Sequence, residues 1–226
     1  MPLEAGGLAP PTIQLASAEL GVPLTAQQAD RLARFAALLA KWNRVYNLTK
    51  RVAPDEVLTH HLLDSLSIVS ELVKAAEGRA VRVLDVGAGG GLPGIPLAIA
   101  LPDAHFTLID SVQKKAAFLQ QVKAELALTN LEVVHARVED YRAPLFDVVV
   151  CRAFAALDEV VRLSAHLLAA DGCWLAMKGA YPTREINALA STSVEMVRAV
   201  KLRVPQLDAE RHLVVLRFRQ AHARHL

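Results

Sequence analysis

The chain has 226 residues, of which 53% are hydrophobic, and a net charge of +2. This length and composition suit one α/β domain with a substantial core. No stretch of about 18 apolar residues lacks a charge, so we expect no membrane span. The N-terminus has no basic segment followed by an apolar one, so we expect no signal peptide and a cytoplasmic location. The two cysteines are too few for a disulfide framework or a zinc site, and we expect buried free thiols and no metal.

The positive charge is gathered in two places. Four basic residues and no acidic one lie between Lys41 and Arg51, and six basic against two acidic residues lie between Lys201 and Leu226. Two basic patches on a nearly neutral body indicate a phosphate-binding surface. Ordinary solvated surface explains the charge alone equally well.

The first third of the chain is predicted to be helical. Residues 1–12 are rich in proline and glycine and are expected to be disordered, and residues 13–20 form a short helix. Thr25 is the expected N-cap of the next helix, with Gln28 as its capping-box partner. That helix carries an apolar face at helical spacing: Leu32, Phe35, Leu38, Leu39 and Trp42.

A third helix is expected to begin at Pro54, in its first position, and to run to a C-cap at Gly78. Residues 1–80 then form a helical extension, and residues 81–226 form the main α/β domain. No linker divides the two parts, so we expect one compact unit.

From residue 81 the pattern alternates between strand and helix. The predicted strands cover residues 81–86, 105–110, 131–136, 146–151, 173–177, 194–204 and 212–219. The predicted helices cover residues 94–101, 112–128, 157–169 and 183–189, the third ended by Asp171-Gly172. This alternation predicts a Rossmann-like α/β fold, a seven-stranded parallel sheet with helices on both faces. The turn at 205–210 is too short for a crossover, so the last two strands should pair antiparallel.

The segment from Val83 to Gly94 reads as a buried strand, a glycine-rich turn and the start of a helix. It holds five of the 11 glycines of the chain. Such a backbone reaches positive φ and lets a ligand approach closely. An ordinary tight turn needs only one or two glycines, so the segment indicates a ligand-binding turn.

Polar residues follow the next strands, where ligands of open α/β sheets bind. Asp110 lies 23 residues after Gly87, where a carboxylate can accept both ribose hydroxyls, although it could instead cap the helix at Val112. Val138 and Glu139 are placed to contact an adenine, or they form an ordinary turn. Arg152 serves a ligand or an internal ion pair, and the sequence favours neither.

Two registers of the glycine turn suggest two cofactors. Gly89-x-Gly91-x-x-Gly94 matches the dinucleotide fingerprint of an oxidoreductase, but its first glycine comes late and Pro93 stiffens the helix start. Asp85-x-Gly87-x-Gly89-x-Gly91 suits S-adenosylmethionine, whose tail carries no phosphate. A non-catalytic RNA-binding module on the same scaffold is the third possibility.

These segments resemble one family, the bacterial 16S ribosomal RNA (guanine-7-)methyltransferases, also called glucose-inhibited division protein B. The resemblance covers residues 42–213. It rests on Trp42-Asn43-x-x-Tyr46-Asn47-Leu48-Thr49, His61-x-x-Asp64-Ser65, Asp85-x-Gly87-x-Gly89-x-Gly91-Leu92-Pro93-Gly94-Ile95-Pro96, Leu108-x-Asp110-Ser111, Arg137-Val138-Glu139, Arg152-Ala153-Phe154, Lys178-Gly179 and Glu210-Arg211-His212-Leu213.

The resemblance implies a class I S-adenosylmethionine-dependent methyltransferase that modifies one guanine in the decoding region of the small-subunit RNA. The residues it places on the cofactor are Gly87, Leu92, Val138, Glu139 and Arg152, to which we add Gly89 and Asp110. The residues expected to face RNA are Asn43, Arg44, Asn47, Lys50, Arg51 and Arg211, with Lys178 either on an RNA phosphate or closing the site. The expected partner is 16S ribosomal RNA, free or in the small subunit or an assembly intermediate, and we expect a monomer.

Nitrogen 7 of guanine has a lone pair and no proton, so its methylation needs proximity and orientation rather than a general base. We therefore expect no catalytic side chain. His61 and Asp64 are interpreted as holding the N-terminal helices against the mouth of the site. Phe154 either stacks on the target base or packs in the core.

Overall fold

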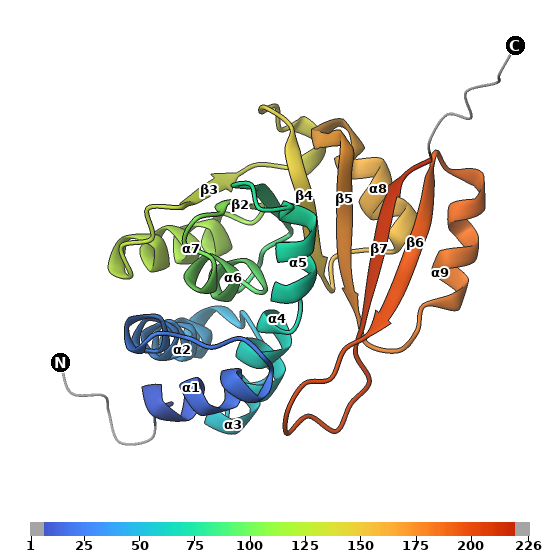
Figure 1. Ribbon diagram of the computed structural model, residues 1–226. Coiled ribbons are helices and arrows are strands. Elements are labelled where there is room, and N and C mark those ends of the chain that lie inside the picture. The colour runs from blue at the N-terminus through green and yellow to red at the C-terminus, as the bar shows by residue number, and fades with distance from the viewer. Residues whose placement is uncertain (1–6, 220–226) are drawn as a thin grey trace, which may run out of the picture.

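The structure, a computed structural model, describes residues 7–219. It contains one seven-stranded sheet of order β3-β2-β1-β4-β5-β7-β6, with helices on both faces (Figure 1). The strands are β1 (Arg82–Val86), β2 (His105–Asp110), β3 (Leu131–His135), β4 (Phe146–Arg152), β5 (Leu168–Lys178), β6 (Val194–Lys201) and β7 (His212–Phe218). The longer helices are α1 (Pro10–Glu19), α2 (Ala26–Tyr46), α5 (Val69–Ala76), α6 (Gly94–Ala100), α7 (Gln113–Glu125), α8 (Leu157–Ser164) and α9 (Thr183–Ala188).

The strand pairing confirms the predicted fold class. Strands β1 to β5 are parallel, and β7 is inserted antiparallel between β5 and β6. The register places Lys178 of β5 opposite His212 of β7. The carboxyl ends of the parallel strands and the start of β7 therefore lie at the same edge of the sheet, where ligands of such folds bind.

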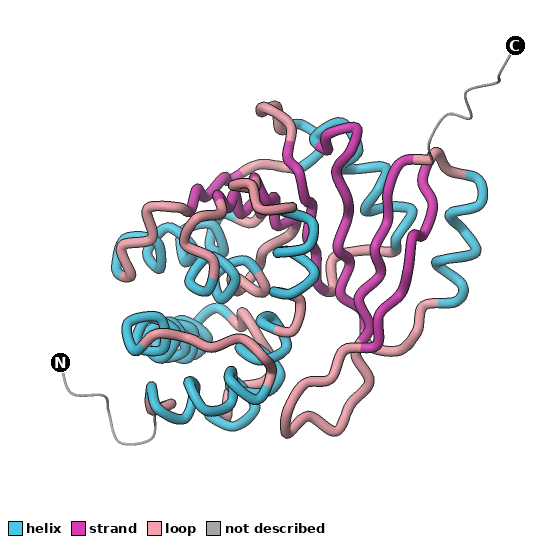
Figure 2. Tube along the Cα trace, in the orientation of Figure 1, coloured by secondary structure: helices cyan, strands magenta, loops and turns pink. Residues whose placement is uncertain are grey.

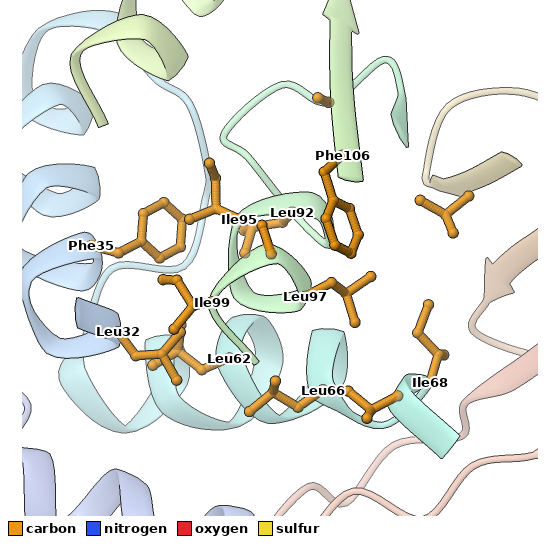
Figure 3. Close-up of a cluster of buried hydrophobic side chains, with 14 of the residues drawn as sticks. Leu32, Phe35, Leu62, Leu66, Ile68, Leu92, Ile95, Leu97, Ile99 and Phe106 are labelled. Atoms are coloured by element: carbon orange, nitrogen blue, oxygen red, sulfur yellow. The ribbon is translucent and has the colours of Figure 1, made fainter. Parts of the chain in front are cut away.

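Two hydrophobic layers hold the sheet between its helices. Helices α8 and α9 cover one face, in a layer that includes Trp174 and Phe146. On the other face α5, α6 and α7 share a larger layer with the N-terminal helices (Figure 2). The close-up in Figure 3 shows Leu32 and Phe35 of α2 facing Ile95 and Ile99 of α6. The N-terminal segment thus adds a further helical layer to the same core.

Helix α2 begins as its sequence predicts. The Thr25 hydroxyl accepts the Gln28 N–H at 3.2 Å, and the Gln28 side chain accepts the Thr25 N–H at 2.8 Å. The Gln28 Nε2 also donates to the carbonyls of Ile99 and Ala100, where α6 ends. The Gln28 side chain therefore caps the beginning of α2 and also satisfies two carbonyls at the end of α6.

The expected disorder of residues 1–12 is wrong for its last part. Helix α1 begins at Pro10, because proline is well suited to the first helical position and Ile13 is buried. Residues 1–6 lie outside the described part of the chain.

The single helix expected from Pro54 to Gly78 is also wrong in detail. Pro54 does open a helix, but the segment divides into α3 (Pro54–Val57), a π-helix η1 (Leu58–Leu63), α4 (Asp64–Leu66) and α5. The hydroxyls of Ser65 and Ser67 donate to the carbonyls of His61 and Asp64 and so compete with the regular helical pattern. Helix α5 ends at Ala76, and its C-cap is Glu77, in the left-handed conformation, rather than Gly78.

The helix expected over residues 157–169 ends early. Helix α8 stops at Ser164, a 3-10 turn η3 (Ala165–Leu167) follows, and β5 already begins at Leu168, which pairs with Phe146. Strand β5 runs through Asp171-Gly172. A Cβ at Gly172 would approach the Asp147 carbonyl of β4 to 2.8 Å, so glycine allows the two strands to lie this close. Strand β6 ends at Lys201 rather than at residue 204.

Both cysteines are buried free thiols, as expected. Burial raises the pKa of Cys151 to about 12 and that of Cys173 to about 11, so neither is ionised near neutral pH. Within residues 7–219 no group of histidine, cysteine and acidic side chains is arranged to hold a metal ion. Over the same residues, no helix combines the length and apolarity that a membrane crossing needs.

Candidate cofactor cleft and its rim

A cleft of about 510 Å³ opens at the carboxyl ends of β1 to β4. It brings together four of the residues predicted to bind the cofactor: Gly87, Asp110, Val138 and Glu139. The other lining residues are Val86, Ile109, Ser111, Val112, Lys115, Ala136, Arg137, Ala153, Phe154, Glu159, Arg162 and Leu163.

Asp110 is the buried acid of this cleft, with 5% of its surface exposed. Its Oδ2 accepts the Gly89 N–H at 2.9 Å, and its Oδ1 accepts the Val112 N–H at 2.8 Å. The helix-capping contact weighed for Asp110 is therefore present, but the side chain is not exposed, and it also fixes the glycine turn. Each carboxylate oxygen has further lone-pair capacity, so the group can still accept hydrogen bonds from a ligand.

Gly87 has a positive φ of 68° and lies under the ring of Phe154. A Cβ at Gly87 would approach the ring Cδ2 of Phe154 to 2.2 Å, so no side chain fits there. Phe154 is 36% exposed and lines the cleft, which argues against the core-packing alternative. The preceding Ala153 has a φ of 51°, a strained conformation for alanine that turns the chain at this point.

Val138 and Glu139 form a 3-10 turn, η2 (Val138–Asp140), directly after β3. Val138 is buried and presents an apolar wall, while Glu139 is ion-paired to Arg137 at 2.6 Å. A hydrogen bond from its own backbone N–H and the Arg137 guanidinium hold the pKa of Glu139 below its usual value. The turn therefore offers an apolar surface beside an ionised carboxylate.

Two predicted cofactor residues lie outside the cleft. Gly89 contributes its N–H to Asp110 rather than lining the opening. Leu92 is 6% exposed and points into the cluster between α2 and α6 (Figure 3). Both residues therefore stabilise the glycine turn on the side away from the cleft, Gly89 through its hydrogen bond and Leu92 through core packing.

Asp85 lies beneath the same turn at the end of β1. Its Oδ2 accepts the Gly94 N–H at 2.9 Å, whereas its Oδ1 is buried and has no partner within residues 7–219. Burial raises the pKa of Asp85 to about 7, and the nearby Arg152 opposes that rise. An unsatisfied buried oxygen is costly, and Asp85 does not itself line the cleft.

Arg152 does not line the cleft, and it does form an internal ion pair. Its Nη1 donates to Asp64 Oδ2 and to the His60 carbonyl, both at 2.9 Å. Arg211 donates from Nε to the other oxygen of Asp64, also at 2.9 Å. One buried carboxylate thus joins the N-terminal helices to the end of β4 and to the residue before β7.

The two histidines do not pair with Asp64. His61 Nε2 lies 2.8 Å from the Thr49 hydroxyl and 3.2 Å from the Arg51 carbonyl. Burial and the charge of Arg152 lower the pKa of His61, and burial together with Arg51 and Arg211 lowers that of His60. These contacts agree with a structural role for His61.

The residues predicted to face RNA divide into two groups. Arg44, Asn47, Lys50 and Arg51 are exposed around the end of α2, with Arg51 paired to Glu56 at 2.9 Å. Asn43 uses its Oδ1 to accept the Thr49 N–H, and Lys178 donates to the Ala155 carbonyl and to Glu185. Asn43, Lys178 and Arg211 therefore have defined structural contacts, and the exposed basic residues among those predicted to face RNA lie around the end of α2.

Sequence reasoning missed the part of the cleft that α7 and α8 contribute. Lys115 lies 3.8 Å from Asp110, and Glu159, Arg162 and Leu163 line the opposite wall. Lys115 could have been found from its position in the first turn after Asp110. The α8 residues carry no such signal, because only the crossing of the helix over β4 and β5 brings them to the cleft.

The cleft fits an S-adenosylmethionine molecule in its donor set. A buried carboxylate suits a ribose diol, an apolar wall suits a purine, and the glycine turn reaches the cleft at Gly87. The strand order and this cleft define a class I S-adenosylmethionine-dependent methyltransferase fold.

Solved structures support this fold class. The ribosomal protein L11 methylase of Lactobacillus delbrueckii subsp. bulgaricus aligns over 70% of this chain and 77% of its own, with a TM-score of 0.53 and 17% identity. A methyltransferase of Thiobacillus denitrificans, solved with S-adenosyl-L-homocysteine, covers 67% of this chain and 90% of its own, with a TM-score of 0.50 and 14% identity.

The family model described as rRNA small subunit methyltransferase G, GidB, matches residues 28–214. Two relatives are called ribosomal RNA small subunit methyltransferase G. The one from Ralstonia nicotianae is 53% identical over 87% of this chain and 90% of its own length. The one from Leptothrix cholodnii is 46% identical over 91% of this chain and 94% of its own length. The chain belongs to this family. The resemblance, the enzyme class and the expected cofactor S-adenosylmethionine are thereby confirmed, and the oxidoreductase alternative loses its support.

Proposed function

We propose that this enzyme transfers a methyl group from S-adenosylmethionine to nitrogen 7 of one guanine in 16S ribosomal RNA. The observation that carries the proposal is a cleft at the carboxyl ends of the strands together with exposed basic residues around the end of α2, in a member of the rRNA small subunit methyltransferase G family. The reaction takes place in the cytoplasm, where its ribosomal substrate is assembled.

In this proposal Asp110 holds the ribose hydroxyls, and Val138 and Glu139 border the adenine. Gly87, with the Phe154 ring packed over it, borders the amino-acid tail, and Arg152 supplies a positive charge for it. Gly89 and Leu92 contribute by fixing the turn, the first through its bond to Asp110 and the second through the core. The burial of Asp110 supports its assignment, because a fixed carboxylate needs little further ordering when it binds.

When bound, S-adenosylmethionine supplies a methyl group activated by a positively charged sulfur. The protein needs only to bring the guanine in line with it, because nitrogen 7 carries no proton to remove. The cleft agrees with this requirement, since each of its acids already has a partner: Asp110 accepts from backbone N–H groups, Glu139 pairs with Arg137, and Glu159 pairs with Arg162. Positioning of this kind can account for a large share of a rate enhancement.

Phe154 supports the placing of the base. Its ring covers Gly87 and is partly exposed, at the end of β4 and beside the cleft. A flat apolar surface at this point suits stacking with a purine that has left its RNA helix.

Direct product mapping tests the function. Purified protein is incubated with S-adenosylmethionine and with 16S ribosomal RNA, small subunits or partly assembled subunits, and the RNA fragments are analysed by mass spectrometry. We expect one guanine to gain a methyl group at nitrogen 7 in at least one RNA form. No methylation in any RNA form, or methylation of another atom, would contradict the proposal.

Asp110→Ala should weaken the binding of S-adenosylhomocysteine, as measured by calorimetry. An unchanged affinity would show that Asp110 does not belong to the cofactor site.

The exposed basic residues around the end of α2 give a prediction for RNA binding. Lys50→Ala removes one exposed charge and should reduce the slope of log affinity against log salt concentration by about 1. Arg217→Ala is the matched control, because Arg217 is exposed near the other end of β7, far from the carboxyl edge of the sheet. Filter binding over a range of salt concentrations measures both. Equal slopes for the two variants would show that RNA does not cross the end of α2.

A further inference from the structure

The Asp64 side chain is a buried acid shared by two arginines. Only 3% of its surface is exposed, and its two oxygens accept hydrogen bonds from Arg152 Nη1 and Arg211 Nε, each at 2.9 Å. The three residues belong to α4, to the last position of β4 and to the residue that precedes β7. Segments 88 and 147 residues away from Asp64 therefore meet at one carboxylate.

This cluster keeps an excess of positive charge. One carboxylate faces two guanidinium groups, and the neighbouring His60 contributes a carbonyl to Arg152 and a ring nitrogen 3.4 Å from Arg211 Nη2. The lowered pKa of His60 keeps that ring neutral near neutral pH. A net positive cluster at the edge of a ligand cleft favours an anion.

Both arginines keep N–H groups that no hydrogen bond within residues 7–219 uses. Arg211 donates from Nε to Asp64 and from Nη1 to the Glu210 carbonyl, and its Nη2 lies 3.4 Å from a ring nitrogen of His60, so one N–H on each Nη remains. All the hydrogen bonds that Arg152 makes within residues 7–219 leave from Nη1, so its Nε and Nη2 remain available. Both side chains are 20% exposed. Arg152 directly precedes Ala153 and Phe154 of the cleft wall, and Arg211 adjoins the pairing of Lys178 with His212 at the same sheet edge.

We propose that Asp64 is a positioning residue, which orients Arg152 toward the carboxylate of the cofactor and Arg211 toward a phosphate of the RNA. The inference rests on the proposed function for these two ligands. Each arginine side chain is long and rotatable. Because an Asp64 oxygen holds one edge of the guanidinium group, the opposite edge faces the ligand. Ordering both side chains in advance lowers the entropy lost on binding.

A purely structural role is the competing explanation, and the chain offers a matched control. Glu71 on α5 is also a buried acid, with 5% exposure, and also ties an N-terminal helix to the sheet, through Arg198 of β6. Its second partner, Lys74, lies on α5 itself. Arg152 adjoins Ala153 of the cleft wall, whereas none of Glu71, Lys74 and Arg198 lines the cleft or adjoins a residue that does. Glu71→Gln and Asp64→Asn thus remove comparable buried charges, but only Asp64→Asn touches the two arginines.

The experiment compares wild type, Asp64→Asn, Asp64→Glu and Glu71→Gln. Calorimetry measures the affinity for S-adenosylhomocysteine, filter binding measures the affinity for small ribosomal subunits and for free 16S ribosomal RNA, and thermal melting measures stability. We expect Asp64→Asn to lower the affinity for S-adenosylhomocysteine at least 10-fold. It should also lower, at least 5-fold, the affinity for whichever of the two RNA forms the wild type binds more tightly. Glu71→Gln should lower the melting temperature and change both affinities less than 2-fold.

Asp64→Glu keeps the charge and guards against a variant that fails to fold. Its melting temperature should be close to that of wild type, while its displaced carboxylate still lowers the affinity for S-adenosylhomocysteine. The proposal is overturned if both Asp64 variants bind both ligands within 2-fold of wild type, or if Glu71→Gln weakens them as much as Asp64→Asn. Weaker S-adenosylhomocysteine binding with no methylation of any RNA by wild type would instead reject the proposed function and keep the cofactor half of the inference.

Discussion

Gly87 combines two requirements that only glycine meets. Its φ of 68° is a left-handed conformation, and the ring of Phe154 occupies the space where a Cβ would stand. Gly21 has a similar φ of 79°, but no atom lies within 4 Å of the position that a Cβ would take there. Substitution at Gly21 therefore tests backbone strain alone, whereas substitution at Gly87 tests strain together with a steric clash.

Gly87→Ala should destabilise the protein by about 1 to 3 kcal/mol, and Gly21→Ala by about 1 kcal/mol, because only the first adds a steric clash to the strain. The double variant Gly87→Ala with Phe154→Ala should recover part of the loss. Urea unfolding measures all three. Equal losses for Gly87→Ala and Gly21→Ala would show that the Phe154 ring moves aside freely.

Asp85 makes stability depend on pH in an unusual direction. Its folded-state pKa is about 7, against 3.8 for the free side chain, because burial disfavours the charged form. Between these two values the folded protein holds a proton that the unfolded chain has lost, so stability falls as the pH rises from about 4 to about 7 and then levels off.

Asp85→Asn removes this titration and keeps an acceptor for the Gly94 N–H. The stability of the variant relative to wild type should rise over that pH range, by no more than about 4 kcal/mol. Urea unfolding at several pH values measures the difference. A constant difference would mean that Asp85 is ionised in the folded protein throughout.

At the scale of the elements, helix α2 depends on one polar pair. Thr25 and Gln28 cap it, and Gln28 also satisfies two carbonyls at the end of α6. The capping box could be predicted from the sequence. The link to α6 could not, because it requires the two helices to pack together.

Thr25→Ala should cost about 1 kcal/mol through the lost cap. Gln28→Ala should cost more, because it also leaves the carbonyls of Ile99 and Ala100 without their side-chain donor. Gln27→Ala, an exposed neighbour, is the control and should change little. Urea unfolding ranks the three, and a larger loss for Thr25→Ala than for Gln28→Ala would contradict the proposed link.

At the scale of the whole molecule, the boundary expected near residue 80 divides the helices from the sheet but not the core. Leu32, Phe35 and Leu62 belong to the same buried cluster as Ile95 and Phe106 (Figure 3). The glycine turn itself touches this layer, since a Cβ at Gly90 would lie 3.3 Å from Leu39 of α2. We infer that the helical extension and the α/β domain fold together.

The full chain should therefore unfold in one cooperative transition, with equal calorimetric and van't Hoff enthalpies. A fragment of residues 81–226 should aggregate or bind a hydrophobic dye, because it exposes the apolar face of α6. Scanning calorimetry and dye binding test both statements. A soluble fragment with a sharp melting transition would establish an independent domain.

Local patterns predicted much of this architecture. The bounds of β2, the cap at Thr25 and the antiparallel final pair follow from alternation, capping chemistry and turn length. The early end of α8 did not, because Leu168 adopts β structure only once β4 is beside it.

The sequence by itself determined the α/β class and the glycine turn, because these depend on short segments whose residues act on their own neighbours, and its resemblance to a known family indicated the cofactor. Only the tertiary structure decided what Arg152 and Arg211 contact, since Asp64 reaches them across 88 and 147 residues. It also decided that Leu92 lies in the core and that α8 walls the cleft. Such contacts follow from packing, and packing joins residues that no sequence spacing relates.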